Sequence, residues 1–226
     1  MAKIIRLENC YHGQRNRFHG ERRRIKDFLN RKMKQFLPKR KKISWPDNIY
    51  YFLTSSTCLH YPYFKEIAQK QLVLNKIIEA SKILNIPVQA FSISLNHFHL
   101  KFYLDDGRKM AKLKNILHSG ISREYRKIYQ IPYKTFWQSS KVFYIKNEEI
   151  SWKITGYIIG NLLKHREVST FAELKENPFS SYRFTIKKFC EETTMEIVRS
   201  VINIEESNEG VVDMKELEGL KVGSSL

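Results

Sequence analysis

The chain of 226 residues has little cysteine and no long apolar segment. Its three cysteines, Cys10, Cys58 and Cys190, lie far apart and form no CxxC pair, which argues against a zinc site or a redox motif built on thiols. No apolar run approaches the roughly 18 residues that a membrane-spanning helix needs. The first residues lack the apolar core of a signal peptide. We therefore expect a cytoplasmic protein with reduced thiols and no membrane partner.

Acidic residues are scarce relative to basic ones. The chain carries 40 Lys and Arg against 23 Asp and Glu, a formal net charge of +17. The excess is uneven, since residues 1–42 hold 15 basic and 3 acidic residues whereas residues 190–226 hold 3 and 9. Such a charge suits a nucleic-acid partner, because each phosphate that Lys or Arg neutralises releases condensed counterions. A ribosome-associated protein or a solvated basic surface would carry the same charge.

The charge and hydropathy patterns divide the chain into three parts. We expect a basic N-terminal arm over residues 1–45, a folded domain over residues 46–189 and an acidic C-terminal tail over residues 190–226. Apolar residues at three- and four-residue steps before Pro38 predict an amphipathic basic helix in the arm, which would lie either along phosphates or on the protein's own body. Three consecutive arginines of this arm are expected nucleic-acid contacts: Arg22, Arg23 and Arg24.

For the folded domain, the order of strand and helix patterns predicts an α+β fold with the ferredoxin-like split βαβ arrangement. In this arrangement an antiparallel sheet carries helices on one side. Aromatic and β-branched residues predict strands, and apolar residues at helical spacing predict helices. The expected strands cover residues 48–57, 88–94, 97–104 and 141–145. The expected helices cover residues 65–85, 108–129 and 148–165, of which the last is added to the core.

The segment HFHLKFYL over residues 97–104 alternates strictly between apolar and polar residues. Phe98, Leu100, Phe102 and Leu104 therefore face one way, and His97, His99, Lys101 and Tyr103 face the other. Two imidazoles at positions i and i+2 leave the same face and can converge on one divalent metal ion. The alternative is a pair of surface histidines without a ligand.

The last expected helix carries a polar stripe at three- and four-residue steps, formed by Lys153, Tyr157, Asn161 and Lys164. Asn161 lies one turn beyond Tyr157 and can offer its amide oxygen to a hard cation such as Mg²⁺ or Mn²⁺. Gly156 and Gly160 each cost about 1 kcal/mol relative to alanine in a helix, which suggests close approach by another backbone or a ligand. Without the histidines, a tyrosine half-buried beside a sheet is the simpler interpretation.

Four short segments occur in an order that known proteins share. They are Leu95–Leu100 (LNHFHL), Phe136–Gln138 (FWQ), Tyr157–Asn161 (YIIGN) and Asn177–Tyr182 (NPFSSY). With these segments the sequence resembles the IS200-like single-tyrosine (HUH) transposases, including relatives associated with repetitive extragenic palindromes. The resemblance covers about residues 48–189, and the four motifs together are more specific than any one of them.

The resemblance implies a nuclease and strand transferase for single-stranded or hairpin DNA. Tyr157 would be the nucleophile and would form a 5′-phosphotyrosine intermediate. The implied ligands of Mg²⁺ or Mn²⁺ are His97, His99 and Asn161. Lys101, Lys153 and Lys164 are expected phosphate contacts, from their predicted faces alone. Relatives act as dimers or alone, so both a homodimer and a monomer stay open.

Two departures from the family pattern keep other functions in view. Leu95 and Leu162 stand where relatives commonly have proline. Neither change removes a reactive group, yet both are compatible with a domesticated, non-catalytic nucleic-acid-binding module. A replication or relaxation initiator would use the same histidine and tyrosine chemistry. An RNA-directed role is a further alternative, in which the 2′-hydroxyl would be recognised.

Deletion of residues 1–42 tests the role of the basic arm. We expect weaker binding to all nucleic-acid sequences alike and a shallower dependence of affinity on salt, because the 15 basic residues of this segment are available to phosphates. Titration of the full and shortened chains at several salt concentrations measures both effects. An unchanged salt slope would show that the arm does not contact phosphates.

Overall fold

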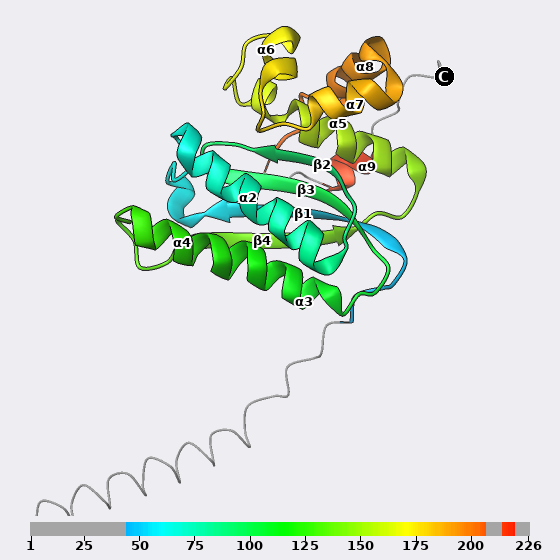
Figure 1. Ribbon diagram of the computed structural model, residues 1–226. Coiled ribbons are helices and arrows are strands. Elements are labelled where there is room, and N and C mark those ends of the chain that lie inside the picture. The colour runs from blue at the N-terminus through cyan, green and yellow to red at the C-terminus, as the bar shows by residue number, and fades with distance from the viewer. Residues whose placement is uncertain (1–43, 207–213, 220–226) are drawn as a thin grey trace, which may run out of the picture. The chain divides into compact units, whose positions relative to one another are not determined.

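The computed structural model describes residues 44–206 and 214–219 (Figure 1). The expected arm helix and the three arginines Arg22, Arg23 and Arg24 lie outside these residues. Within the described ranges, no helix has both the length and the apolar character needed to cross a lipid bilayer.

Four antiparallel strands form one sheet in the order β2-β3-β1-β4. The strands are β1 (Ile49–Thr57), β2 (Val88–Ile93), β3 (His97–Leu104) and β4 (Trp137–Tyr144). The crossover between β1 and β2 is the helix α2 (Ile67–Leu84), and two further helices, α3 (Lys109–Lys114) and α4 (Ile121–Ile128), connect β3 to β4. This order confirms the α+β fold with a split βαβ core.

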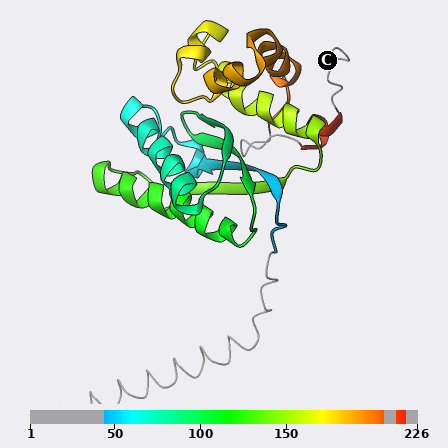
Figure 2. The ribbon, with the colours of Figure 1, turned by 45° about the vertical axis from the view of Figure 1, so that its right-hand side comes forward.

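Helices cover both faces of the sheet (Figure 2). The helices α2, α3 and α4 lie on one face, and α5 (Glu148–Lys164) lies across the other. The remaining described elements are a short helical turn after β1 (Cys58–His60) and the helices α6 (Phe171–Glu176), α7 (Tyr182–Phe189), α8 (Glu191–Val201) and α9 (Met214–Gly219). The core ferredoxin-like helices are thus on one side, as expected, and the added helix closes the other side.

Strand β3 joins the two sides of the core. Its apolar residues are at most 1% exposed, and Phe98 points toward the α3–α4 side, where its ring centroid lies 5.7 Å from that of Trp137 and 6.5 Å from that of His118. Its polar residues face α5, where the Lys101 ammonium donates to Ser151 and Thr155. The strict alternation of the sequence therefore places the polar side chains of β3 on one face of the sheet and its apolar side chains on the other.

One helix has an unexpected interior, and one strand boundary is wrong. The helix predicted over residues 108–129 covers residues 109–128 but contains a π-helical turn at Asn115–Gly120, between α3 and α4. A side chain from β4 contacts this turn: the indole of Trp137 donates a hydrogen bond of 2.9 Å to the carbonyl of His118. Strand β4 begins at Trp137 rather than at residue 141, because a register shift in β1 at Ser56/Thr57 extends the pairing to Trp137.

The serine pair of the Asn177–Tyr182 segment has a structural role. The Ser180 hydroxyl donates to the carbonyl of Ile159 in α5 at 2.9 Å. Ser181 accepts a hydrogen bond from the Phe91 backbone N–H on its hydroxyl at 2.8 Å and donates its own N–H to the Phe91 carbonyl at 2.9 Å. The segment therefore fastens α5 to the free edge of β2.

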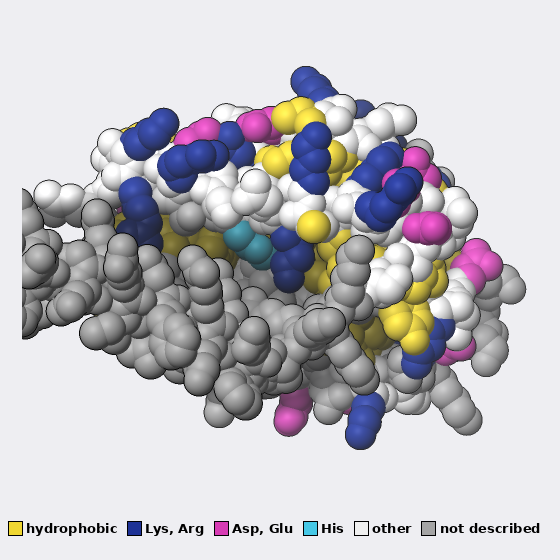
Figure 3. Space-filling model, turned by 90° about the horizontal axis from the view of Figure 1, so that it is seen from below, with side chains coloured by type: hydrophobic (Ala, Val, Ile, Leu, Met, Phe, Trp, Pro, Cys, Tyr) yellow, Lys and Arg dark blue, Asp and Glu magenta, His cyan; other side chains and the backbone are white. Residues whose placement is uncertain are grey.

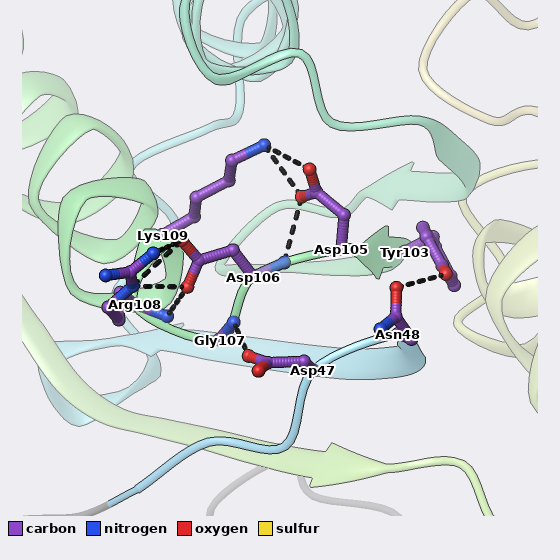
Figure 4. A network of polar contacts seen from close by, with 8 residues as sticks. All are labelled: Asp47, Asn48, Tyr103, Asp105, Asp106, Gly107, Arg108 and Lys109. Carbon is purple, nitrogen blue, oxygen red and sulfur yellow. Dashed lines mark hydrogen bonds and ion pairs between the residues drawn. The ribbon is translucent and has the colours of Figure 1, made fainter.

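A polar network fixes the end of β3 that is farthest from His97 (Figure 4). The Gly107 N–H donates to Asp47 at 2.6 Å, and Lys109 pairs with Asp105 at 2.7 Å. A Cβ atom at Gly107 would lie 1.9 Å from the carbonyl oxygen of Trp45, so only glycine fits this close approach. Because most of these ion pairs are solvent-exposed, the network sets the path of the chain more than it adds stability.

The two glycines of α5 are explained by α8. A Cβ atom at Gly156 would lie 2.6 Å from the carbonyl oxygen of Ile197, and one at Gly160 would lie 2.6 Å from Cγ1 of Val198. The helix α8 belongs to the segment that we expected to be a weakly patterned tail, and it packs directly on the tyrosine-bearing helix. The close approach predicted from the glycines is therefore made by α8, through the backbone and side chain of Ile197 at Gly156 and through the side chain of Val198 at Gly160.

Substitution of Gly156 by alanine tests this packing. An alanine in a helix interior normally gains about 1 kcal/mol over glycine, but here α8 must shift, and we expect a net loss of about 1–3 kcal/mol in the free energy of unfolding. Urea unfolding measures it. Gly219→Ala is the matched control, since no heavy atom lies within 4 Å of its Cβ position. A Gly156→Ala protein as stable as the parent would contradict the close approach.

Candidate active site

His97 and His99 lie on the face of β3 that α5 covers. Their ring centroids are 4.8 Å apart, and the residues are 3% and 0% exposed. Antiparallel pairing places Ser56 and Thr54 of β1 beside them. The structure therefore places the two histidines in a buried site and not on the surface.

Helix α5 brings Asn161 to the histidine pair. The Oδ1 atom of Asn161 lies 3.1 Å from Nε2 of His97, and the residue is fully buried. The other ring nitrogen of His97, Nδ1, lies 2.7 Å from Oδ1 of Asn96. The three ligands that the family resemblance implies therefore meet in one place.

Both histidines are held in the neutral form. Burial, and after it the nearby His165, lower the pKa of His97 to about 4. Burial, followed by the neighbouring His97, holds the pKa of His99 well below its usual range. Neutral imidazole is the form that binds metal ions, so no proton has to be displaced at neutral pH.

The polar atoms of this site fit a bound cation. Both ring nitrogens of His99 and the amide nitrogen of Asn161 are buried and have no hydrogen-bond partner. Such atoms are rare in folded proteins, and a metal ion would give one nitrogen of His99 a partner. Among the described residues, no group of three or more His, Cys, Asp or Glu side chains is placed to hold a metal ion. The set that fits is therefore two imidazoles with an amide oxygen.

Tyr157 lies in the same buried site, one helical turn before Asn161. It is 2% exposed, and its ring packs edge-on against Phe52 and His99 at centroid distances of 6.1 and 5.1 Å. Its hydroxyl donates a hydrogen bond of 2.7 Å to the carboxylate of Glu206. The proposed nucleophile and the proposed ligands are thus in contact through the ring of His99.

Glu206 is the site residue that sequence reasoning missed. Besides the Tyr157 hydroxyl, its carboxylate contacts the Lys164 ammonium at 3.0 Å and Nε2 of His165 at 3.4 Å. The carbonyl of Ile204 also accepts from Lys164. Burial alone would raise the pKa of Glu206, but hydrogen bonds from His165 and Tyr157 and the nearby histidines lower it below its usual range. In the sequence, Glu206 is only one of several acidic residues in the segment 190–226, and no motif distinguishes it.

The carboxylate keeps the tyrosine protonated. Burial, then the negative charge of Glu206 and its hydrogen bond, raise the pKa of Tyr157 well above 10. A neutral phenol is a weak nucleophile. In this arrangement Tyr157 is therefore held near the histidines in its unreactive form.

The three lysines expected to contact phosphates all bind protein groups. Lys101 is 4% exposed and donates to Ser151 and Thr155. Lys153 is 1% exposed and pairs with Glu149 at 2.8 Å. Lys164 lies 5.1 Å above the Tyr157 ring and pairs with Glu206. Their role as phosphate contacts stays a prediction, and each would have to exchange or extend these contacts.

Basic side chains are spread over the visible part of one face of the described domain (Figure 3). Figure 3 shows Lys and Arg side chains distributed over the visible part of one face, with Asp and Glu between them. No single basic patch dominates this view. A polyanion would therefore meet a diffuse positive field.

Comparisons with known proteins give a fold but no family. The sequence matches no family model, and no curated protein matches it. Among solved structures, the chain is similar to a REP-associated tyrosine transposase bound to a REP hairpin, with a TM-score of 0.51 and 16% sequence identity over 69% of this chain and 88% of that chain. The two proteins share the fold, as the sequence resemblance predicts.

A second solved structure is more distantly similar. It is described as a candidate transposase from Deinococcus radiodurans R1, and the match has a TM-score of 0.40 and 14% identity over 53% of this chain and 95% of that chain. This likeness is too weak to add to the first.

The protonated state of Tyr157 predicts how stability changes in alkali. A pKa raised by folding adds stability that is present below pH 10 and is lost as the pH rises above it. One such group makes the free energy of unfolding fall by about 1.4 kcal/mol per pH unit. In urea unfolding experiments, we expect a flatter pH dependence above pH 10 for Tyr157→Phe. For Glu206→Gln we expect the slope of the parent over a narrower pH range, because Tyr157 stays buried but loses the effect of the carboxylate on its pKa.

Tyr144→Phe is the matched control for this measurement, since Tyr144 is 49% exposed. It should keep the slope of the parent protein. If Tyr157→Phe and Tyr144→Phe gave the same slope as the parent, Tyr157 would not be the buried, protonated group described above.

Proposed function

We propose that this protein is a metal-dependent nuclease and strand transferase for single-stranded or hairpin DNA, with Tyr157 as its nucleophile. The observation that carries the proposal is the meeting of Tyr157 with His97, His99 and Asn161 between β3 and α5. These side chains supply a nucleophile and a ligand set for a cation, which is what transesterification at phosphorus needs. The fold shared with a tyrosine transposase supports a transposase-like function.

In the proposed reaction, Oη of Tyr157 attacks the phosphorus of a phosphodiester. The bond between Oη and phosphorus forms as the bond between phosphorus and the 3′ oxygen breaks. One DNA end remains on the protein as a 5′-phosphotyrosine, and the other leaves as a 3′-hydroxyl. The energy of the phosphodiester is conserved, so a second 3′-hydroxyl can reverse or redirect the transfer.

The protein groups around Tyr157 determine where its proton goes. The hydroxyl points at Oε1 of Glu206, which is therefore the acceptor within hydrogen-bond reach. The Lys164 ammonium lies 3.0 Å from this carboxylate and 5.1 Å from the centre of the tyrosine ring, where its positive charge favours the phenolate. Glu206 and Lys164 thus act on the phenol in opposite directions.

The residues that would hold the cation are His97, His99 and Asn161. When bound, Mg²⁺ or Mn²⁺ would act as a Lewis acid that stabilises charge developing on the phosphoryl oxygens. The two neutral imidazoles offer their ring nitrogens, and Asn161 offers its amide oxygen in place of its contact with His97. The tight packing of all three limits the positions that a scissile phosphate can occupy.

DNA has to gain access to this site. His97, His99 and Tyr157 are each no more than 3% exposed. A phosphodiester reaches them only after α5 moves or the segment that carries Glu206 leaves Tyr157. The proposed reaction therefore includes a conformational step before chemistry.

The burial of these site residues also favours a second candidate function. A non-catalytic DNA-binding module would retain the net charge of +17 and would keep Tyr157 permanently bonded to Glu206. In that case the buried tyrosine serves only packing. The two functions differ in whether a covalent adduct forms.

Trapping of the covalent intermediate tests the proposal. The protein is incubated with Mn²⁺ and single-stranded hairpin DNA labelled at its 3′ end, the end that a 5′-phosphotyrosine retains, and is then boiled in detergent. We expect label on the protein for the parent and none for Tyr157→Phe, because phenylalanine has no hydroxyl. His97→Ala should also form no adduct while it keeps most of its DNA affinity, since binding depends on many charges and cleavage on one ion.

Tyr144→Phe, an exposed tyrosine, should form the adduct like the parent. Loss of both adduct and DNA binding in His97→Ala would indicate misfolding. Absence of any adduct across a varied panel of hairpins, with DNA binding intact, would instead establish the non-catalytic module.

A further inference from the structure

A cavity lies on the same side of the sheet as the tyrosine site. Its volume is about 750 Å³, and it opens between the N-terminal part of α5, the helix α7 and the adjoining ends of β1, β2 and β3. Part of its wall comes from three residues that also contact one another, Lys101, Ser151 and Thr155. This size and depth suit a small ligand or one unit of a polymer.

Lys101 gives the cavity a buried positive charge. Its ammonium makes three hydrogen bonds, to the carbonyl and hydroxyl of Ser151 at 3.0 and 2.7 Å and to the hydroxyl of Thr155 at 2.8 Å. None of these acceptors is charged, and Lys101 pairs with no carboxylate among the residues that the structure describes. Among the described residues, no carboxylate is therefore paired with this ammonium group.

The charged residues at the cavity rim also carry an excess of positive charge. Lys146 and Lys188 line it together with a single carboxylate, that of Glu148. Glu148, Lys146 and Lys188 are all exposed, so their charges are partly screened by solvent. With Lys101 the lining carries a net charge of +2, which favours an anionic ligand.

Aromatic side chains form much of the remaining wall. Trp152 and Phe189 meet edge-on, with ring centroids 4.4 Å apart. Phe184 is 62% exposed although it is large and apolar, and it faces the same cavity. Tyr50 closes the far side, beneath Lys101 at 5.7 Å. Aromatic faces beside cations are the elements that bind a nucleobase and its phosphate.

The cavity adjoins the tyrosine site. On β3, Lys101 follows His99 by two residues and faces the same way, so their Cα atoms are about 7 Å apart. On α5, Thr155 precedes Tyr157 by two residues. The Lys101–Thr155 hydrogen bond therefore separates the two spaces. A distance of about 7 Å corresponds to about two stacked nucleotides of a single strand.

We propose that this cavity binds one nucleotide of the DNA strand near the phosphate cleaved by Tyr157, with the base against Phe184 and Trp152 and the phosphate at Lys188 above Lys101. The proposal rests on the proposed function for the identity of the strand, and it adds a separate base-binding subsite. It follows that the base at one position, counted from the cleaved phosphate, contributes more to affinity than its neighbours.

An abasic scan of a single-stranded oligonucleotide tests the subsite. Affinity of the full chain is measured without divalent metal, so that no strand is cleaved, while one abasic residue is moved along the DNA. We expect one position at which loss of the base weakens binding about 5- to 150-fold, the range for removal of one base–aromatic stack. In Phe184→Ala, intact DNA should bind more weakly, and the abasic penalty at that position should disappear.

Neighbouring lysines of α7 provide a matched charge control. Lys188 lines the cavity, whereas Lys187 is exposed on the same helix and is not part of the lining. Each change to glutamine removes one positive charge, so a general electrostatic effect would be equal in both. We expect Lys188→Gln to weaken binding severalfold more than Lys187→Gln.

The outcomes separate this proposal from the proposed function. Equal effects of the two lysine changes together with no sensitive abasic position would overturn the subsite, even if Tyr157 forms its covalent adduct. A sensitive position that Phe184→Ala abolishes would support the subsite, even if no adduct forms. An abasic penalty that persists unchanged in Phe184→Ala would place the base elsewhere and would also overturn the subsite.

Discussion

The packing of α5 across the polar face of β3 is the constraint on which the candidate site depends. It buries two histidines, an asparagine and a tyrosine, groups that normally prefer water, between a sheet and a helix. The position of the helix is set from outside the site, by α8 against Gly156 and Gly160 and by Ser180 on the carbonyl of Ile159. Structural glycines and serines thus determine where the reactive groups lie.

Burial determines the protonation states in this site as well as its shape. Desolvation disfavours charge, so His97 and His99 stay neutral and Tyr157 stays protonated. The first effect favours metal binding and the second opposes nucleophilic attack. Burial therefore keeps the two histidines ready to bind a metal ion and keeps the tyrosine in its unreactive, protonated form. The charged groups that can alter this balance, Lys164 and Glu206, lie at its edge.

Local patterns predict the elements that carry the reactive groups. The strict alternation of residues 97–104 matches β3, and the helical spacing over residues 148–165 matches α5. The π-helical turn before α4 and the early start of β4 were missed, because both depend on contacts with Trp137 that are distant in sequence.

The largest gap is the segment after Cys190. Its acidic composition predicts a tail, whereas α8 packs on α5 and Glu206 bonds to Tyr157. Neither contact has a local signal, since Glu206 lies 49 residues from its partner. The glycines of α5 gave the one advance indication, because a helix interior accepts two glycines only where something must come close. The glycines showed where on α5 another element comes close, but not that this element is α8.

Strand β3 also explains why one face of the sheet holds two different spaces. His97, His99 and Lys101 follow one another at alternate positions, so the change from imidazole to ammonium divides the face. On the imidazole side, neutral ligands and a protonated phenol suit a cation and the phosphate bound to it. On the ammonium side, Lys101 has no carboxylate partner among the described residues and lies beside aromatic walls. A polymer with alternating phosphates and bases matches both sides at once, which neither an isolated phosphate nor a free base does.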